Sequence, residues 1–145
     1  MTMAPPPPAL TPPPAHVQVV DQVGGLCFPA VGFPVKIPAT SDSIALAQGW
    51  VRAICTDGAA AVILRVCIAY VPLFGGMVNA DCATRVWRPS PPGRYRLNVV
   101  YPCAGPVSRA FRRRPWWTTG QVTVIPFGSG TQSRVGVAGP RRLAC

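Results

Sequence analysis

The most apolar stretch of the chain covers residues 61–71, AVILRVCIAYV, and contains one charged residue, Arg65. Read as a strand, it carries apolar side chains on both alternating faces, as in a central strand that is covered on both sides. Its β-branched residues, and the Pro72 and Gly75-Gly76 that follow it, favour a strand over a buried helix. A charge inside such a strand must reach solvent, an aspartate or a polyanion, so the surroundings of Arg65 test this interpretation.

Residues 94–101, RYRLNVVY, show the clearest alternation of apolar and polar side chains. Tyr95, Leu97, Val99 and Tyr101 share one face, and Arg94, Arg96 and Asn98 share the other with Val100. This pattern predicts a half-buried antiparallel strand. We expect further short strands at residues 16–23, 121–125 and 133–137.

Prolines and glycines restrict the secondary structure that the remaining segments can form. Residues 26–38 have prolines at 29, 34 and 38, a spacing that suits an extended edge segment and not a central strand. Residues 40–54 permit either a short capped helix or a strand, and we favour a strand with a bulge at Gly49. Residues 77–87 read as a loop with a short strand at its end, and residues 141–145 as a basic tail.

The predicted strands recur at intervals of roughly ten to fifteen residues without an internal repeat. The chain also contains 19 Pro and 14 Gly, which leave few windows long enough for a helix. We therefore expect an all-β protein, an antiparallel β-sandwich of jelly-roll-like type. Residues 16–145 form a single domain of this kind. Residues 1–15, MTMAPPPPALTPPPA, form an extended proline-rich arm.

The chain is strongly basic, with a formal net charge of +10. Thirteen of its fourteen strong bases are arginine, and its acids are four aspartates. A positive field of this size favours polyanions such as nucleic acid, an anionic membrane or an acidic protein. A compositional bias of the gene would give the same excess without selection for binding. Charged residues make up only 12 %, so we expect a partner or further copies of the chain to cover part of the surface.

Six cysteines permit three disulfides, but their spacing does not fix the pairing. The proline-rich arm does not look like an apolar signal peptide, so we expect no export and free, buried thiols. There is no CxxC pair, and the single histidine, His16, follows the arm; we expect no metal site and no cofactor. No run reaches the roughly twenty apolar residues of a membrane span.

Catalytic patterns are missing from the sequence. The position of His16 and the four separated aspartates offer neither a hydrolase triad nor a carboxylate pair. There is also no glycine-rich phosphate loop. We therefore expect no enzyme, no catalytic residue and no small-molecule substrate.

The most specific polar feature is an arginine-rich segment that precedes two adjacent tryptophans. Guanidinium groups grip phosphates, and exposed aromatic rings stack on unpaired bases. In the alternative interpretation the two tryptophans begin a core strand, one ring inward and one outward, and the arginines belong to a solvated loop. The candidate nucleic-acid-binding residues are Arg109, Arg112, Arg113, Arg114, Trp116, Trp117, Arg141 and Arg142.

The segment ILRVCIAYVP at residues 63–72, followed by a glycine-containing loop, resembles a strand and turn of small icosahedral-virus coat proteins. The proline-rich arm, the number of strands and the sparse charge are also similar to their shell domain. This resemblance implies an eight-stranded jelly roll that self-assembles into a shell and contacts packaged RNA, in the virion and the host cytoplasm.

Our leading hypothesis is therefore a structural, self-assembling viral coat or virion component. A second hypothesis is a secreted, disulfide-bonded interaction module, which a count of free thiols separates from the first. A third is an overprinted accessory protein that binds an acidic or proline-recognising partner.

Overall fold

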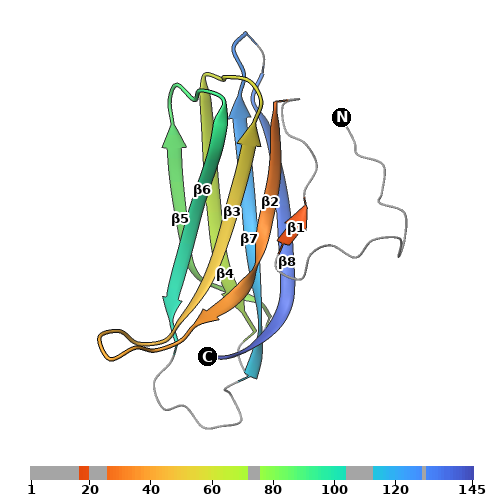
Figure 1. The fold of residues 1–145 in the computed structure, drawn as a ribbon. Helices are drawn as coiled ribbons and strands as arrows, with labels where there is room; N and C mark the ends of the chain where they lie inside the picture. Colours follow the sequence, from red (N-terminus) through yellow and green to blue (C-terminus); the bar gives the residue numbers. More distant parts are fainter. Residues whose placement is uncertain (1–16, 20–25, 72–75, 104–112, 129) are drawn as a thin grey trace.

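The computed structural model describes residues 17–19, 26–71, 76–103, 113–128 and 130–145. Two antiparallel sheets pack face to face (Figure 1), so the predicted all-β antiparallel sandwich is confirmed. One sheet has the order β1-β2-β3-β6 and the other the order β5-β4-β7-β8. The strands are β1 (Val17–Val19), β2 (Cys27–Ile37), β3 (Leu46–Cys55), β4 (Ala61–Tyr70), β5 (Val78–Trp87), β6 (Gly93–Pro102), β7 (Arg113–Ile125) and β8 (Gln132–Ala144).

The strand order is that of an immunoglobulin-type sandwich. Strands β2, β3 and β6 occupy the places of strands A, B and E, and strands β4, β7 and β8 those of C, F and G. The hairpins β2–β3, β4–β5 and β7–β8 each keep neighbours in sequence side by side. A jelly roll instead pairs strands from opposite ends of the chain within each sheet. The sandwich thus agrees with the prediction, and the order of its strands differs from the jelly roll we expected.

Strand β4 lies inside its sheet, between β5 and β7. Its even-numbered side chains from Val62 to Ile68 are buried in the core between the sheets. On its other face Arg65 is exposed and donates a hydrogen bond of 3.4 Å from Nη1 to Oγ1 of Thr84. The predicted central strand is confirmed, and its one charge reaches solvent as the interpretation required.

The prolines of β2 limit its pairing with β1 but not its pairing with β3. Strand β1 pairs with β2 only from Ala30 to Gly32, between Pro29 and Pro34, which lack the N–H that a longer ladder needs. The rest of the outer edge of β2 has no partner strand among the described residues. The expectation of an edge segment is therefore wrong: β2 pairs with β3 from Cys27 to Ile37 and lies between β1 and β3, because the prolines shorten only the ladder to β1.

Three local predictions need correction. The bulge expected at Gly49 lies on the opposite strand, where the register shifts between Gly32 and Val35. The expected loop at 77–87 is the full strand β5, held in place by its pairing with β4 along almost its whole length. The expected basic tail at 141–145 belongs to β8 up to Ala144, because these residues pair with the start of β7.

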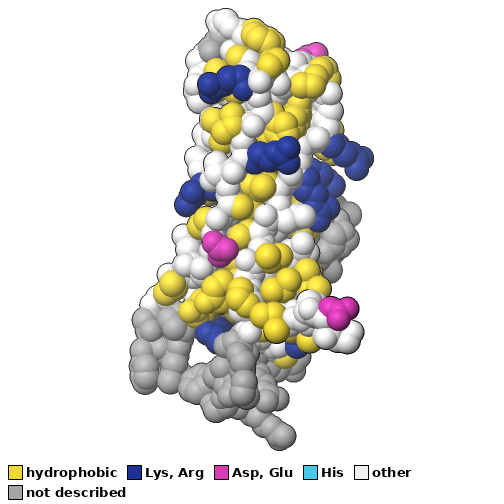
Figure 2. Space-filling model, turned by 90° about the vertical axis from the view of Figure 1, so that its left-hand side faces the viewer, with side chains coloured by type: hydrophobic (Ala, Val, Ile, Leu, Met, Phe, Trp, Pro, Cys, Tyr) yellow, Lys and Arg dark blue, Asp and Glu magenta, His cyan; other side chains and the backbone are white. Residues whose placement is uncertain are grey.

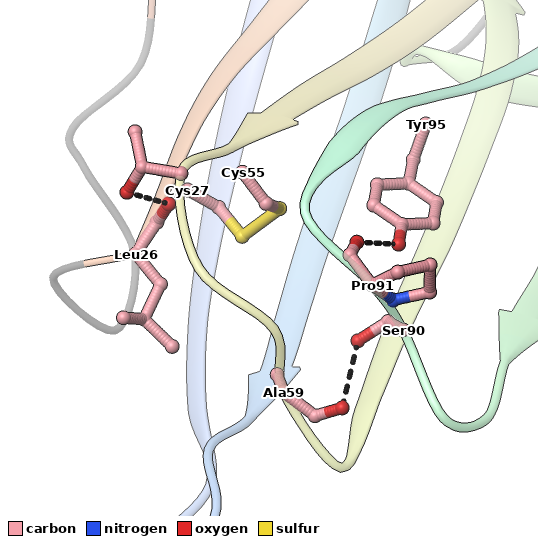
Figure 3. Close-up of a disulfide and its surroundings, with 8 residues drawn as sticks. Leu26, Cys27, Cys55, Ala59, Ser90, Pro91 and Tyr95 are labelled. Carbon is pink, nitrogen blue, oxygen red and sulfur yellow. Dashed lines mark hydrogen bonds between the residues drawn. A yellow bond between two sulfur atoms is a disulfide. The ribbon is translucent and has the colours of Figure 1, made fainter.

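The structure also contradicts the expectation of free thiols, because all six cysteines form disulfides. Cys27–Cys55 joins β2 to β3 (Figure 3), and Cys67–Cys82 joins β4 to β5. In both pairs the two residues are direct partners across the strands, which brings their sulfur atoms together. Cys103–Cys145 joins the segment after β6 to the end of β8 and so links the two sheets.

Two side-chain hydrogen bonds fix the entry into β6 (Figure 3). The hydroxyl of Ser90 donates to the carbonyl oxygen of Ala59 at 3.1 Å, next to the backbone bridge between the same residues. The hydroxyl of Tyr95 donates to the carbonyl oxygen of Pro91, four residues earlier. The contact of Ser90 ties the segment before β6 to the segment before β4, and the contact of Tyr95 holds β6 to its own preceding turn.

Candidate functional site

The outer face of the β2-β3-β6 sheet carries a tryptophan with little exposed surface. Trp50 alternates along β3 with the core residues Val51 and Ala53, so its side chain projects to the outer face. Its direct partners are Gly32 on β2 and Asn98 on β6. Only 9 % of the residue is exposed. A ring on the outside of a sheet reaches such a low exposure only when its neighbours cover it.

Two arginines provide that cover. The Cζ atoms of Arg52 and Arg96 lie 5.6 and 4.6 Å from the centre of the Trp50 ring. Arg96 is also fixed by a hydrogen bond of 3.0 Å from its Nε to Oδ1 of Asn98. Arg94 stands on the same face of β6, two residues from Arg96, and is exposed. We call Trp50, Arg52, Arg94, Arg96 and Asn98 the arginine–tryptophan face.

Arg52 and Arg96 are direct partners across β3 and β6, so two positive charges stand opposite each other. Like charges in this position destabilise a sheet. The described aspartates lie elsewhere: Asp42 and Asp57 in the connections before and after β3, and Asp81 on β5 of the other sheet. The Nε atom of Arg52 is buried without a hydrogen-bond partner. The arginine–tryptophan face therefore concentrates N–H donors and positive charge, with no carboxylate of the described residues to balance them.

This arrangement suits a ligand with several anionic oxygens. Guanidinium groups donate paired hydrogen bonds to phosphate, sulfate or carboxylate oxygens. The Trp50 ring is covered by the two guanidinium groups, so it supports them and is not open for base stacking. Figure 2, which views the molecule from the β5–β6 side, shows arginine or lysine side chains spread among apolar ones, with few acidic groups between them.

The structure describes some of the site residues predicted from the sequence and leaves others outside its described ranges. Arg109 and Arg112 lie outside the described residues, and Arg113 is described only as the first residue of β7. Trp116 is 1 % exposed in the core, whereas Trp117 is half-buried on the opposite face of the same strand. The two rings thus follow the alternative interpretation, one inward and one outward. Nucleic-acid binding by these residues stays a prediction.

Three of the predicted residues, Arg114, Arg141 and Arg142, lie on the paired ends of β7 and β8. Arg141 is the direct partner of Trp116 across β7 and β8, and its Cζ lies 5.2 Å from the ring centre of Phe33. The Cζ of Arg114 lies 5.9 Å from the ring centre of Trp116. Arg142 follows on β8 and is exposed. This group belongs to β7 and β8, in the other sheet from the arginine–tryptophan face.

Sequence reasoning did not select the residues of the arginine–tryptophan face. The alternation in residues 94–101 already placed Arg94, Arg96 and Asn98 on one polar face. The missing information was the pairing of β6 with β3, which brings Arg96 opposite Arg52 and beside Trp50.

Two features are absent from the part of the chain that the structure describes. No three His, Cys, Asp or Glu side chains come together there in a way that fits a metal ion. The same residues include no helix with the length and apolar character needed to cross a membrane.

Comparisons with known proteins give no relative. No family model, no curated protein and no solved structure matches the chain. The functional argument therefore rests on the fold and the geometry described above.

Proposed function

We propose that this protein is a disulfide-bonded interaction module that binds a polyanion through its arginine–tryptophan face. The observation that carries the proposal is the pair Arg52 and Arg96, which stand opposite each other on the covered ring of Trp50. Such a pair costs stability in the free protein, and an anionic ligand removes that cost by neutralising both charges. The role is binding and not catalysis.

The three disulfides support a protein that functions in an oxidising compartment. Such bonds form and persist in secreted or lumenal proteins, and small domains use them to supplement a limited core. In this protein they connect neighbouring strands within each sheet and also link the two sheets. This supports the secreted module, which the sequence offered as its second hypothesis, over a protein of the host cytoplasm.

Among polyanions we favour a sulfated polysaccharide over RNA. Sequence-tolerant binding of single-stranded nucleic acid combines a basic groove with aromatic rings that stack on bases. The ring at the centre of this face is 9 % exposed and lies under Arg52 and Arg96. The face thus offers guanidinium donors to anionic oxygens and no open ring to a base.

The proposal is tested by measuring retention on immobilised heparin as a function of salt, for the full chain and for Arg52→Gln and Arg96→Gln. Each lost contact should lower the slope of log affinity against log salt by about 1. Arg65→Gln is the matched control, because it removes the same charge from an exposed position on the other sheet.

An equal loss in all three variants would show that only the net charge matters, and would refute a site on the arginine–tryptophan face. Retention on single-stranded RNA under the same salt conditions tests the choice of ligand. Tighter binding to RNA than to heparin would contradict the sulfated polysaccharide.

A self-assembling coat or virion component is a second candidate, and one observation favours it. Several large apolar side chains are exposed on the outer faces of the strands, among them Phe28 (50 %), Val135 (64 %) and Val137 (48 %). Exposed apolar side chains of this kind provide contacts between copies of a chain when they form a continuous patch. Particle sizing at high protein concentration and moderate salt tests this candidate: a monomer under all conditions would exclude it.

A further inference from the structure

A cavity of about 110 Å³ lies at one end of the sandwich, away from the arginine–tryptophan face. Both sheets contribute to its walls: Tyr101 and Pro102 belong to β6, Tyr70 to β4, and Arg114 and Trp116 to β7. The Cys103–Cys145 disulfide, which follows Pro102 directly, links the two sheets at this end. The walls are therefore held by strand pairing and by a covalent bond.

Three of the five residues that line the cavity are aromatic. The ring centres of Tyr70 and Trp116 lie 5.0 Å apart, and Tyr101 lies 6.4 Å from Tyr70 and 6.2 Å from Trp116. The guanidinium carbon of Arg114 lies 4.6 Å from the ring centre of Tyr70. One cation thus already occupies the ring face of Tyr70, so a second cation entering the cavity would be repelled.

Two N–H donors of the wall lack partners. Trp116 is 1 % exposed, and its Nε1 is buried without a hydrogen-bond acceptor. The Nε of Arg114 is also buried without one. Buried donors are satisfied in the great majority of proteins, because an unpaired donor costs free energy. Two unpaired donors on residues that line one cavity indicate an acceptor that the described residues do not supply.

We propose that this cavity binds a carboxylate group with a short aliphatic chain. The carboxylate oxygens accept hydrogen bonds from Trp116 and Arg114 and neutralise the guanidinium charge. The aliphatic carbons contact the rings of Tyr70 and Tyr101. The volume lies well below the roughly 300 Å³ at which pockets for larger organic ligands begin. A sugar ring or a nucleobase is therefore too large, and the site is distinct from polyanion binding.

The test uses the full ¹⁵N-labelled chain and the indole N–H signals of its four tryptophans. The Trp116 signal is assigned by elimination, with Phe replacing Trp50, Trp87 and Trp117 in turn, so that the core residue itself is kept. Titration with sodium propionate, against sodium chloride at the same ionic strength, should give a saturable shift of the Trp116 signal in the millimolar range. Acetyl-aspartyl amide in place of propionate shows whether an acidic peptide side chain binds better than a free acid.

Arg114→Gln should abolish the saturable shift, and Arg114→Lys, which keeps the charge but lacks Nε–H, should weaken it. Arg65→Gln is the control and should leave it unchanged. The proposal is wrong if the wild-type Trp116 signal does not respond to propionate. It is also wrong if sodium sulfate or propylammonium chloride shifts this signal as strongly as propionate does. These shifts are measured on the wild-type chain, so they do not depend on whether an Arg114 variant folds.

Discussion

Gly32→Ala is expected to displace Trp50 and to weaken both the fold and the proposed binding face. A Cβ atom at position 32 would lie 2.1 Å from Cε2 and 2.2 Å from Nε1 of Trp50. Carbon atoms in good contact are about 3.5–4.0 Å apart, so the ring must move by roughly 1.5 Å. Glycine stands here because the ring lies directly on the backbone of β2.

The cost of this displacement has two parts. Forcing an extra methyl group into a packed position costs about 1–3 kcal/mol. The contacts of Arg52 and Arg96 with the ring contribute about 0.5–1 kcal/mol each, and part of that is lost when the ring moves. The sum is about 2–4 kcal/mol, which corresponds to a fall in Tm of roughly 5–15 °C in a chain of this size.

Thermal unfolding by circular dichroism measures the change, and heparin retention measures its effect on binding. Gly76→Ala is the matched control, because a Cβ atom there meets no heavy atom within 4 Å. If Gly32→Ala unfolds within about 1 °C of Gly76→Ala, Trp50 does not lie on Gly32 and the reasoning fails. Normal stability with lost retention would contradict it as well, because both effects follow from the same movement of the ring.

Four further predictions concern other parts of the fold. Replacing Cys67 and Cys82 together by alanine opens a bond between residues 15 apart, so we expect a loss of about 3 kcal/mol in the free energy of unfolding by urea. The native chain should also show no free thiol in a colorimetric count under denaturing conditions. Tyr95→Phe removes the hydrogen bond to the carbonyl of Pro91 and should cost about 1 kcal/mol by the same urea measurement. Arg65→Gln, at an exposed position, should change stability by less than about 0.5 kcal/mol, and a larger loss would show that Arg65 is not solvated.

The strands that the sequence predicted best are of two kinds. In one kind, apolar and polar side chains alternate, and in the other nearly all side chains are apolar. Strand β4 was recognisable from its apolar run, and β6 from the alternation that buries Tyr95 and Val99. Strand β5 was missed because it lies at the edge of its sheet, where most of its side chains are exposed and the sequence VNADCATRVW shows no clear period. Its strand conformation comes from pairing with β4, which local sequence does not show.

The same limit explains the cysteines and the binding face. Whether Cys27 meets Cys55 depends on the register of β2 against β3. Whether Arg96 meets Arg52 depends on the pairing of β3 with β6, which are separated in the chain by β4 and β5. Local patterns place a residue on a face of its own strand. Only the pairing of strands distant in sequence decides which residues share that face.

The position of the arginines bears on whether their excess reflects selection or base composition. Composition accounts for their number, but Arg52 and Arg96 stand opposite each other, where like charges cost about 0.2–1 kcal/mol. Their contacts with Trp50 return a similar amount, so replacing either by glutamine should change stability little. Both explanations therefore predict nearly the same Tm for Arg52→Gln and Arg96→Gln. They differ in polyanion retention. A purely compositional excess predicts the same loss as at Arg65, whereas a selected face predicts a larger loss at positions 52 and 96.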